Sequence, residues 1–387
     1  MIGEVSPVRR AAQRFVLVIG AGALGAAVCS TGVRYTGPDD DETLRALRAS
    51  NTPAPSARPV GSTEAEALRL LRRAAAAESD TTYEGRKLYG SWSDSGSESV
   101  LAEVRHVAGR GTWLRVTTAS GQVARGDAGR MEIADGDGDL DQQALTLLTD
   151  QYTLRIAESS RCLGRDVTVV EATPLGAEQV AGRFWIDDAS GLLLRRELYD
   201  SRGRTVRATA FLDIELTTAA TALSRAQTAS VTKRRPGVRN QRALDEAALD
   251  RLRDDGWVLP DMLPAGMVLY RARSVETRHG GEAVQLTYSD GLFALSLFAQ
   301  RGRLDTSALR GFHASEFGET VVHSRPGLYR QVVFASGDTV YTLVTDLPDA
   351  ELQQIVAALP HTEPSSSLRS RVGRGIDRMG SWINPFE

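Results

Sequence analysis

The chain has 387 residues, of which 42% are hydrophobic and 25% charged, and its formal net charge is −3. This composition is that of a soluble globular protein with room for two domains, and it argues against wholesale disorder. Because 46 basic residues are balanced by 49 acidic ones, the chain lacks the basic field that attracts nucleic acid. Two cysteines and five scattered histidines provide neither a zinc-ligand cluster nor a disulfide framework.

An uncharged apolar segment at residues 15–33, FVLVIGAGALGAAVCSTGV, follows Arg9, Arg10 and Arg14. About 20 such residues span a bilayer as a helix, and the preceding arginines indicate that the chain beyond the segment is exported. The same pattern fits a signal peptide, so a cleaved signal and a retained anchor both stay open. We expect residues 1–37 to comprise a short cytoplasmic stub followed by this signal or transmembrane segment. The rest of the protein is expected to act in the periplasm or cell envelope.

The same segment contains a GxGxxG pattern at residues 20–25, which is how a dinucleotide-binding turn begins. A second strand ending in an acidic residue should then follow. Residues 38–62 instead indicate a flexible tether rich in proline, alanine and serine. A nicotinamide-dependent enzyme is therefore the weaker hypothesis, and no cofactor is predicted.

The region from 63 to 216 is predicted to be one domain that begins with a helix and continues as antiparallel strands. Residues 63–78 place Leu68, Leu71 and Ala75 at helical spacing behind a capping box formed by Ser62-Thr63 and Glu66. Strands are expected at 82–92, 99–107, 111–118, 167–172, 180–187, 192–199 and 205–215, with a helix at 141–151. Successive short hairpins indicate an antiparallel meander rather than a parallel nucleotide-binding sheet.

Residues 217–250 are expected to be a linker, and residues 251–361 a second domain. In this domain we predict a strand at 291–300, a hairpin over 329–345 and a closing helix at 349–359. The tail at 362–387 interleaves four arginines with apolar residues, which fits either a disordered segment or a basic amphipathic one.

Catalytic motifs are absent from the sequence. There is no Gly-x-Ser-x-Gly elbow, HExxH or Walker motif, and the acidic residues lack partners at the spacing of an acid/base pair. We therefore expect a non-enzymatic protein without catalytic residues, metal or cofactor.

Two stretches resemble the MucB/RseB regulators of extracytoplasmic-stress sigma factors. Within 184–211, a W-x-D-x-x-x-x-L-x-x-R-x-x-L-x-D-x-x-G pattern is formed by Trp185, Asp187, Leu192, Arg195, Leu198, Asp200 and Gly203. We call this the first pattern. The second pattern, LTYSDGLFALSL at 286–297, is similar to a stretch of the family's second domain, and LPAGM at 263–267 resembles the entry to that domain. The resemblance covers roughly residues 63–360 and leaves out the tether and the tail.

The resemblance implies an α+β fold, in which a LolA-like curved antiparallel sheet with helices, a half-barrel, is followed by a smaller α+β domain. It also implies a regulator that binds the extracytoplasmic part of a membrane anti-sigma factor, with sensing of lipid or lipoprotein acyl chains as a secondary role. A lipid or lipoprotein carrier of the LolA-like type is the alternative.

Four residues of the second pattern, Tyr288, Asp290, Leu292 and Phe293, are nominated as partner-binding residues because they lie in the most family-like part of the second domain. The simpler interpretation of these residues is a turn and a core.

Overall fold

A computed structural model describes residues 63–94, 96–117, 131–133, 142–217, 239–276, 282–309, 311–318 and 320–362. The expected stub and apolar segment at 1–37, the tether at 38–62 and the tail beyond 362 lie outside these residues. Within the described ranges, no helix has both the length and the apolar character that crossing a membrane requires.

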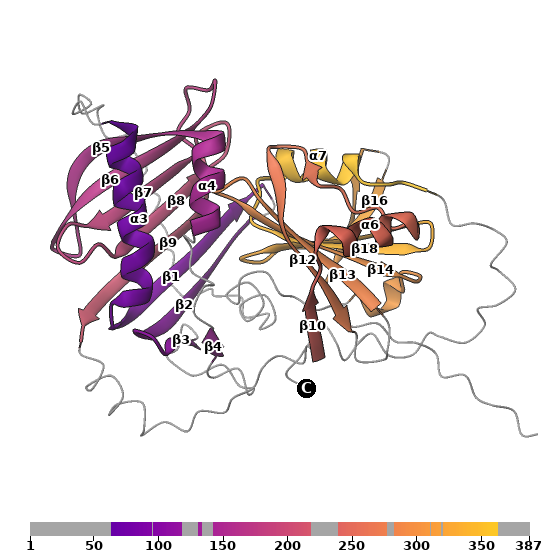
Figure 1. Cartoon of the computed structure of the whole chain (residues 1–387), viewed down its shortest axis with the longest axis horizontal. Helices are drawn as coiled ribbons and strands as arrows, with labels where there is room; N and C mark the ends of the chain where they lie inside the picture. Colours follow the sequence, from indigo (N-terminus) through magenta and orange to yellow (C-terminus); the bar gives the residue numbers. More distant parts are fainter. Residues whose placement is uncertain are drawn as a thin grey trace, which may run out of the picture.

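The first domain is an open antiparallel sheet with two helices against one of its faces (Figure 1). Its elements are α3 (Glu64–Asp80), β1 (Tyr83–Ser93), β2 (Gly96–Val107), β3 (Gly111–Thr117), β4 (Met131–Ile133), α4 (Gln142–Gln151), β5 (Tyr152–Cys162), β6 (Arg165–Pro174), β7 (Gly182–Asp187), β8 (Leu193–Tyr199) and β9 (Thr205–Leu216). The strand order is β4-β3-β2-β1-β9-β8-β7-β6-β5. The predicted meander is confirmed, and β9 returns to pair with β1.

The second domain is a separate antiparallel sheet that lies beside the first (Figure 1). Its elements are β10 (Arg239–Ala243), α6 (Glu246–Asp254), β11 (Met262–Leu263), β12 (Met267–Glu276), β13 (Glu282–Ser289), β14 (Ala294–Arg301), the 3₁₀ turn η2 (Thr306–Ala308), β15 (His313–Phe317), β16 (Thr320–Arg325), β17 (Arg330–Ser336), β18 (Thr339–Thr345) and α7 (Asp349–Ala358). Because β10 pairs with β12, this sheet begins at Arg239, inside the range 217–250 that was expected to be a linker. The α+β fold class is as predicted.

Helix α3 begins where the sequence predicts. The Thr63 hydroxyl accepts a hydrogen bond from the Glu66 amide and the Glu66 carboxylate accepts one from the Thr63 amide, each at 3.3 Å, which is a capping box. The helix buries Ala67, Leu71, Ala74 and Ala77, one residue every three or four.

The face of the first sheet that packs against α3 is here called the inner face. Alternate residues of the strands point toward it, among them Tyr89, Val100 and Phe211, all of which are buried. The opposite face carries ion pairs, such as Arg105 with Glu84 at 3.2 Å. The inner face is therefore mainly apolar, although it also buries Lys87 beside the rings of Tyr89 and Phe211. The opposite face carries ion pairs, as expected for an antiparallel sheet with one solvated face.

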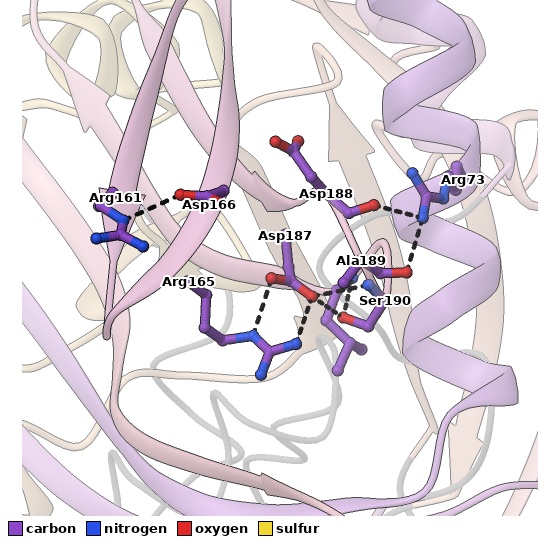
Figure 2. A network of polar contacts seen from close by, with 9 residues as sticks. Arg73, Arg161, Arg165, Asp166, Asp187, Asp188, Ala189 and Ser190 are labelled. Atoms are coloured by element: carbon purple, nitrogen blue, oxygen red, sulfur yellow. Dashed lines mark hydrogen bonds and ion pairs between the residues drawn. The ribbon is translucent and has the colours of Figure 1, made fainter.

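The first pattern builds the two turns that flank β8. In the β7–β8 turn, the Asp187 carboxylate accepts two hydrogen bonds from Arg165 of β6 at 2.9 Å each, and one from the Ser190 amide at 2.7 Å (Figure 2). Arg73 of α3 donates to the carbonyls of residues 188 and 189 at 2.9 and 3.1 Å. In the β8–β9 turn, Asp200 accepts from the amides of residues 202 and 204. These pattern residues therefore fix hairpins within the first domain.

Asp187 makes the stability of this domain depend on pH. Burial favours the neutral acid, but the hydrogen bonds from Arg165 and Ser190 outweigh it and lower the pKa of the Asp187 carboxyl below its usual value. The carboxylate thus contributes stability that is fully present above its unfolded pKa of about 4. This contribution is lost as the pH falls through the lower pKa of the folded state.

We predict that Asp187→Asn lowers the free energy of unfolding by about 2 kcal/mol at neutral pH. In urea unfolding series, this difference should shrink as the pH falls below about 4. Asp188→Asn, which alters an exposed carboxylate of the same turn, should change the free energy by less than about 0.5 kcal/mol. A difference for Asp187→Asn that is independent of pH would contradict this account.

Candidate functional site

The turn between β13 and β14 joins the two domains through a buried carboxylate. Asp290, which is 4% exposed, accepts hydrogen bonds at Oδ1 from the amides of Leu292 at 2.8 Å and Phe293 at 2.7 Å. Its Oδ2 accepts a hydrogen bond of 2.6 Å from the hydroxyl of Tyr152, the first residue of β5 in the other domain. Both oxygens of the carboxylate are therefore satisfied, one of them across the junction.

The same turn fits closely against the first domain. Gly291 has φ +95°, and a Cβ there would lie 2.3 Å from the Leu148 amide nitrogen in α4, so only glycine is accommodated. The Leu292 side chain packs against Gly182 of β7, and its carbonyl accepts a hydrogen bond from Arg196 of β8. Apolar residues of both domains form one continuous core cluster here.

The four nominated residues all lie inside this arrangement. Tyr288 is completely buried and donates to the carbonyl of Pro260, 2.7 Å away within the second domain. Asp290, Leu292 and Phe293 are at most 5% exposed. A partner would therefore touch these residues only if the domains separated, and their role in binding a partner stays a prediction.

Burial at the junction also shifts the pKa values of Asp290 and Tyr152. Burial raises the pKa of Asp290 above its usual value, although the hydrogen bonds from Tyr152 and from the two amides oppose this shift. Burial, followed by the neighbouring charge of Asp290, raises the pKa of the Tyr152 phenol. The phenol therefore remains a hydrogen-bond donor throughout the physiological pH range.

A cleft of about 670 Å³ lies where the β1–β2 and β8–β9 turns of the first domain face the β16–β17 turn and the start of α7 in the second. We call it the junction cleft. Its charged lining consists of six carboxylates, Asp94, Glu98, Asp200, Asp346, Asp349 and Glu351, and three arginines, Arg202, Arg204 and Arg330. The lining is thus acidic in balance.

The arginines of the junction cleft are largely engaged within it. Arg204 contacts Asp94 at 2.9 Å and Asp200 at 2.7 Å, and Arg330 pairs with Asp349. The lining contains neither histidine nor cysteine, and the described part of the chain holds no group of three or more His, Cys, Asp or Glu placed to bind a metal. Asp94, Asp200 and Asp349 are therefore paired with arginines of the same lining, and Asp346 lies 3.7 Å from Arg207, which stands outside it.

Sequence analysis missed the residues that the first domain contributes to this site, including Tyr152 and Leu148. Tyr152 is 138 residues away from Asp290 in the chain. Leu148 lies in the helix predicted at 141–151, whereas Tyr152 begins β5, a strand that the sequence analysis did not predict.

Part of the first domain matches the model of a known family. The model of the MucB/RseB N-terminal domain matches residues 128–233, a range that contains the whole first pattern. The predicted resemblance to the MucB/RseB family is thereby confirmed. The second pattern, at 286–297, lies beyond the matched range.

Several solved structures are similar to the chain. The crystal structure of MucB in complex with MucA(peri) is 20% identical, covers 77% of this chain and 100% of its own, and has a TM-score of 0.43. The MucA/MucB complex of Pseudomonas aeruginosa is 20% identical, with 77% and 99% coverage and a TM-score of 0.44. A LolA superfamily protein from Nitrosomonas europaea is 12% identical, with 39% and 93% coverage and a TM-score of 0.18. No curated protein sequence matches the chain significantly.

We predict that Gly291→Ala separates the two domains while each keeps its sheet, because the added Cβ collides with the backbone of α4. Small-angle scattering should show a larger radius of gyration, and limited proteolysis should cleave the chain between the domains faster. Gly318→Ala is the matched control, because Gly318 also has positive φ, at +62°, but a Cβ there meets nothing within 4 Å. Equal compactness of the two variants would contradict the prediction.

Proposed function

We propose that this chain is a non-enzymatic regulator of the periplasm or cell envelope that binds the extracytoplasmic part of a membrane anti-sigma factor. Three features support the proposal: the family match of the first domain, the order of the two sequence patterns, and the apolar segment at 15–33 behind three arginines. The protein would thereby control an envelope-stress sigma factor from outside the cytoplasm.

The observation that carries the proposal is the junction cleft. Its walls come from both domains, with Glu98 on the first and Glu351 on the second. An extended segment with arginine or lysine side chains would find carboxylates on each side, and complementary charge speeds association and selects the partner. A partner bound there would also depend on the domains remaining closed.

Sensing of lipid or lipoprotein acyl chains is proposed as a secondary role, and carriage of such ligands is the alternative function. The inner face of the first sheet is mainly apolar, and this is the chemistry that an acyl chain needs. A carrier needs only the first domain. Here a second domain packs against the first through the buried carboxylate of Asp290 and the close approach of Gly291 to the backbone of α4. This two-domain arrangement favours regulation.

The first test is affinity purification of the chain from envelope extract, with mass spectrometry of proteins and lipids. Recovery of a single-pass anti-sigma factor is the expected result. Recovery of lipid or lipoprotein without such a protein would replace regulation with carriage.

The acidic balance of the cleft gives a sharper prediction. Glu98→Gln combined with Glu351→Gln should weaken binding of the anti-sigma segment about tenfold at low salt, and the difference should fade at high salt. The control is Asp254→Asn combined with Glu316→Gln, which removes two exposed charges outside the cleft. Isothermal titration should show no change for the control pair, and equal weakening by both pairs would contradict a binding site in the cleft.

A second prediction concerns the effect of the nominated residues on partner affinity. Asp290→Ala combined with Phe293→Ala should weaken partner binding, because it removes the carboxylate and the apolar side chain that close the junction. The measurement is partner affinity, with circular dichroism to show that both sheets remain folded. Unchanged affinity in the folded double variant would remove these residues from the account.

A further inference from the structure

The carboxylate at the domain junction has only neutral donors among the described residues. Asp290 is 4% exposed, and its donors are two amides of its own turn and the hydroxyl of Tyr152. A carboxyl group that is buried without a cation favours its protonated form, because burial penalises the charge. Since Tyr152 belongs to the first domain, separation of the domains takes away part of the cover of Asp290 and returns the carboxyl group toward water.

Other carboxylates lie close to the same group. Asp346 accepts a hydrogen bond of 2.8 Å from the amide of residue 294, while Asp290 accepts one of 2.7 Å from the amide of residue 293. The two carboxylates therefore bind successive amides of one backbone segment. Glu351 of α7 adds a further negative charge, which contributes to the raised pKa of the Tyr152 phenol. Like charges at this distance disfavour ionisation of the buried carboxyl group.

Two arginines of the first domain reach the junction, and each contacts other groups there. Arg207 of β9 donates from Nη1 to the carbonyl of Leu328 at 2.7 Å, and its Nε lies 3.7 Å from the Asp346 carboxylate. Arg196 of β8 donates to the carbonyl of Leu292. The positive charges that face the junction from β8 and β9 are therefore placed on Asp346 and on backbone carbonyls.

We propose that closure of the two domains takes up one proton on Asp290, so that the junction is a pH-sensitive switch that closes in acid and opens as the pH rises. A phenol hydroxyl can accept a hydrogen bond as well as donate one, so protonated Asp290 keeps its contact with Tyr152. The inference does not depend on the proposed function. Because the walls of the junction cleft come from both domains, acid also favours the assembled cleft.

The direction of the pH dependence follows from the burial. In the closed form, burial and the charge of Asp346 raise the pKa of Asp290 above its ordinary value of about 4. The contribution to closure is thus fully present below the pKa of the open form and is lost as the pH rises through the raised pKa of the closed form. Between these two values, release of one proton makes the opening constant rise about tenfold per pH unit.

The test measures domain opening of the full chain in nanodiscs from the labelling rate of a buried thiol. Cys29→Ser and Cys162→Ser remove the native thiols. Leu328→Cys then places a thiol in the second domain at a position that is 2% exposed and belongs to an apolar cluster of the first. Each rate is divided by that of an unfolded peptide with the same neighbours at the same pH. In this reporter chain, the opening constant should rise with pH by up to about tenfold per unit.

Asp290→Asn in the reporter chain distinguishes a proton switch from a purely structural carboxylate. Asparagine is a neutral isostere of the protonated acid, so this variant should stay closed, with an opening constant that is independent of pH and about tenfold lower at about pH 8. Loss of a structural carboxylate would instead raise opening at every pH. Asp254→Asn, which alters an exposed carboxylate outside the junction, is the matched control and should leave the pH dependence unchanged.

A second variant keeps the inference falsifiable if Asp290→Asn does not fold. Tyr152→Phe removes a donor that favours the ionised carboxylate, so it should shift the rise of the opening constant to higher pH. An opening constant that is independent of pH in the reporter chain would overturn the inference. The same pH dependence in the reporter chain and in Asp290→Asn, or an unshifted rise in Tyr152→Phe, would also overturn it.

Discussion

The structure depends on one carboxylate placed between two domains. Asp290 is buried, and an ionised carboxylate in such a place is costly unless donors surround it. Two of its donors are amides of its own turn and the third is the Tyr152 hydroxyl of the other domain. Separation of the domains removes that third donor, so the contact fixes one relative placement of the two sheets. The junction cleft exists only because of this placement, since its walls come from both domains.

The two sequence patterns have different physical roles. The residues of the first pattern fix hairpin turns: Asp187 accepts from Arg165 and Ser190, and Asp200 closes the turn into β9. The second pattern fixes the junction, through Asp290 and through the close approach of Gly291 to α4. Such patterns therefore show how the scaffold is built. Of the two, only the first contributes to the lining of the junction cleft, through Asp200 in the β8–β9 turn.

Much of the fold was predictable because its signals are local. The capping box of α3, the alternation in the strands and the aspartates that close the β7–β8 and β8–β9 turns all act over a few residues. The junction was not predictable in the same way. From its neighbours in the sequence, Asp290 is an ordinary turn residue, and no local pattern indicates that it accepts a hydrogen bond from Tyr152. The start of the second sheet at Arg239 was missed because β10 is a short polar edge strand without an apolar alternation. Arg207 also gives no local sign that it is buried under a turn of the other domain.

The most direct measurement for the central claim is hydrogen exchange of the full chain with and without the extracytoplasmic part of the anti-sigma factor. If the partner binds in the cleft between closed domains, protection should increase in the β1–β2 and β8–β9 turns and at the start of α7. Exchange of the buried turn at 290–293 should stay slow or become slower. Protection confined to one domain, or faster exchange at 290–293 when the partner is bound, would contradict the account.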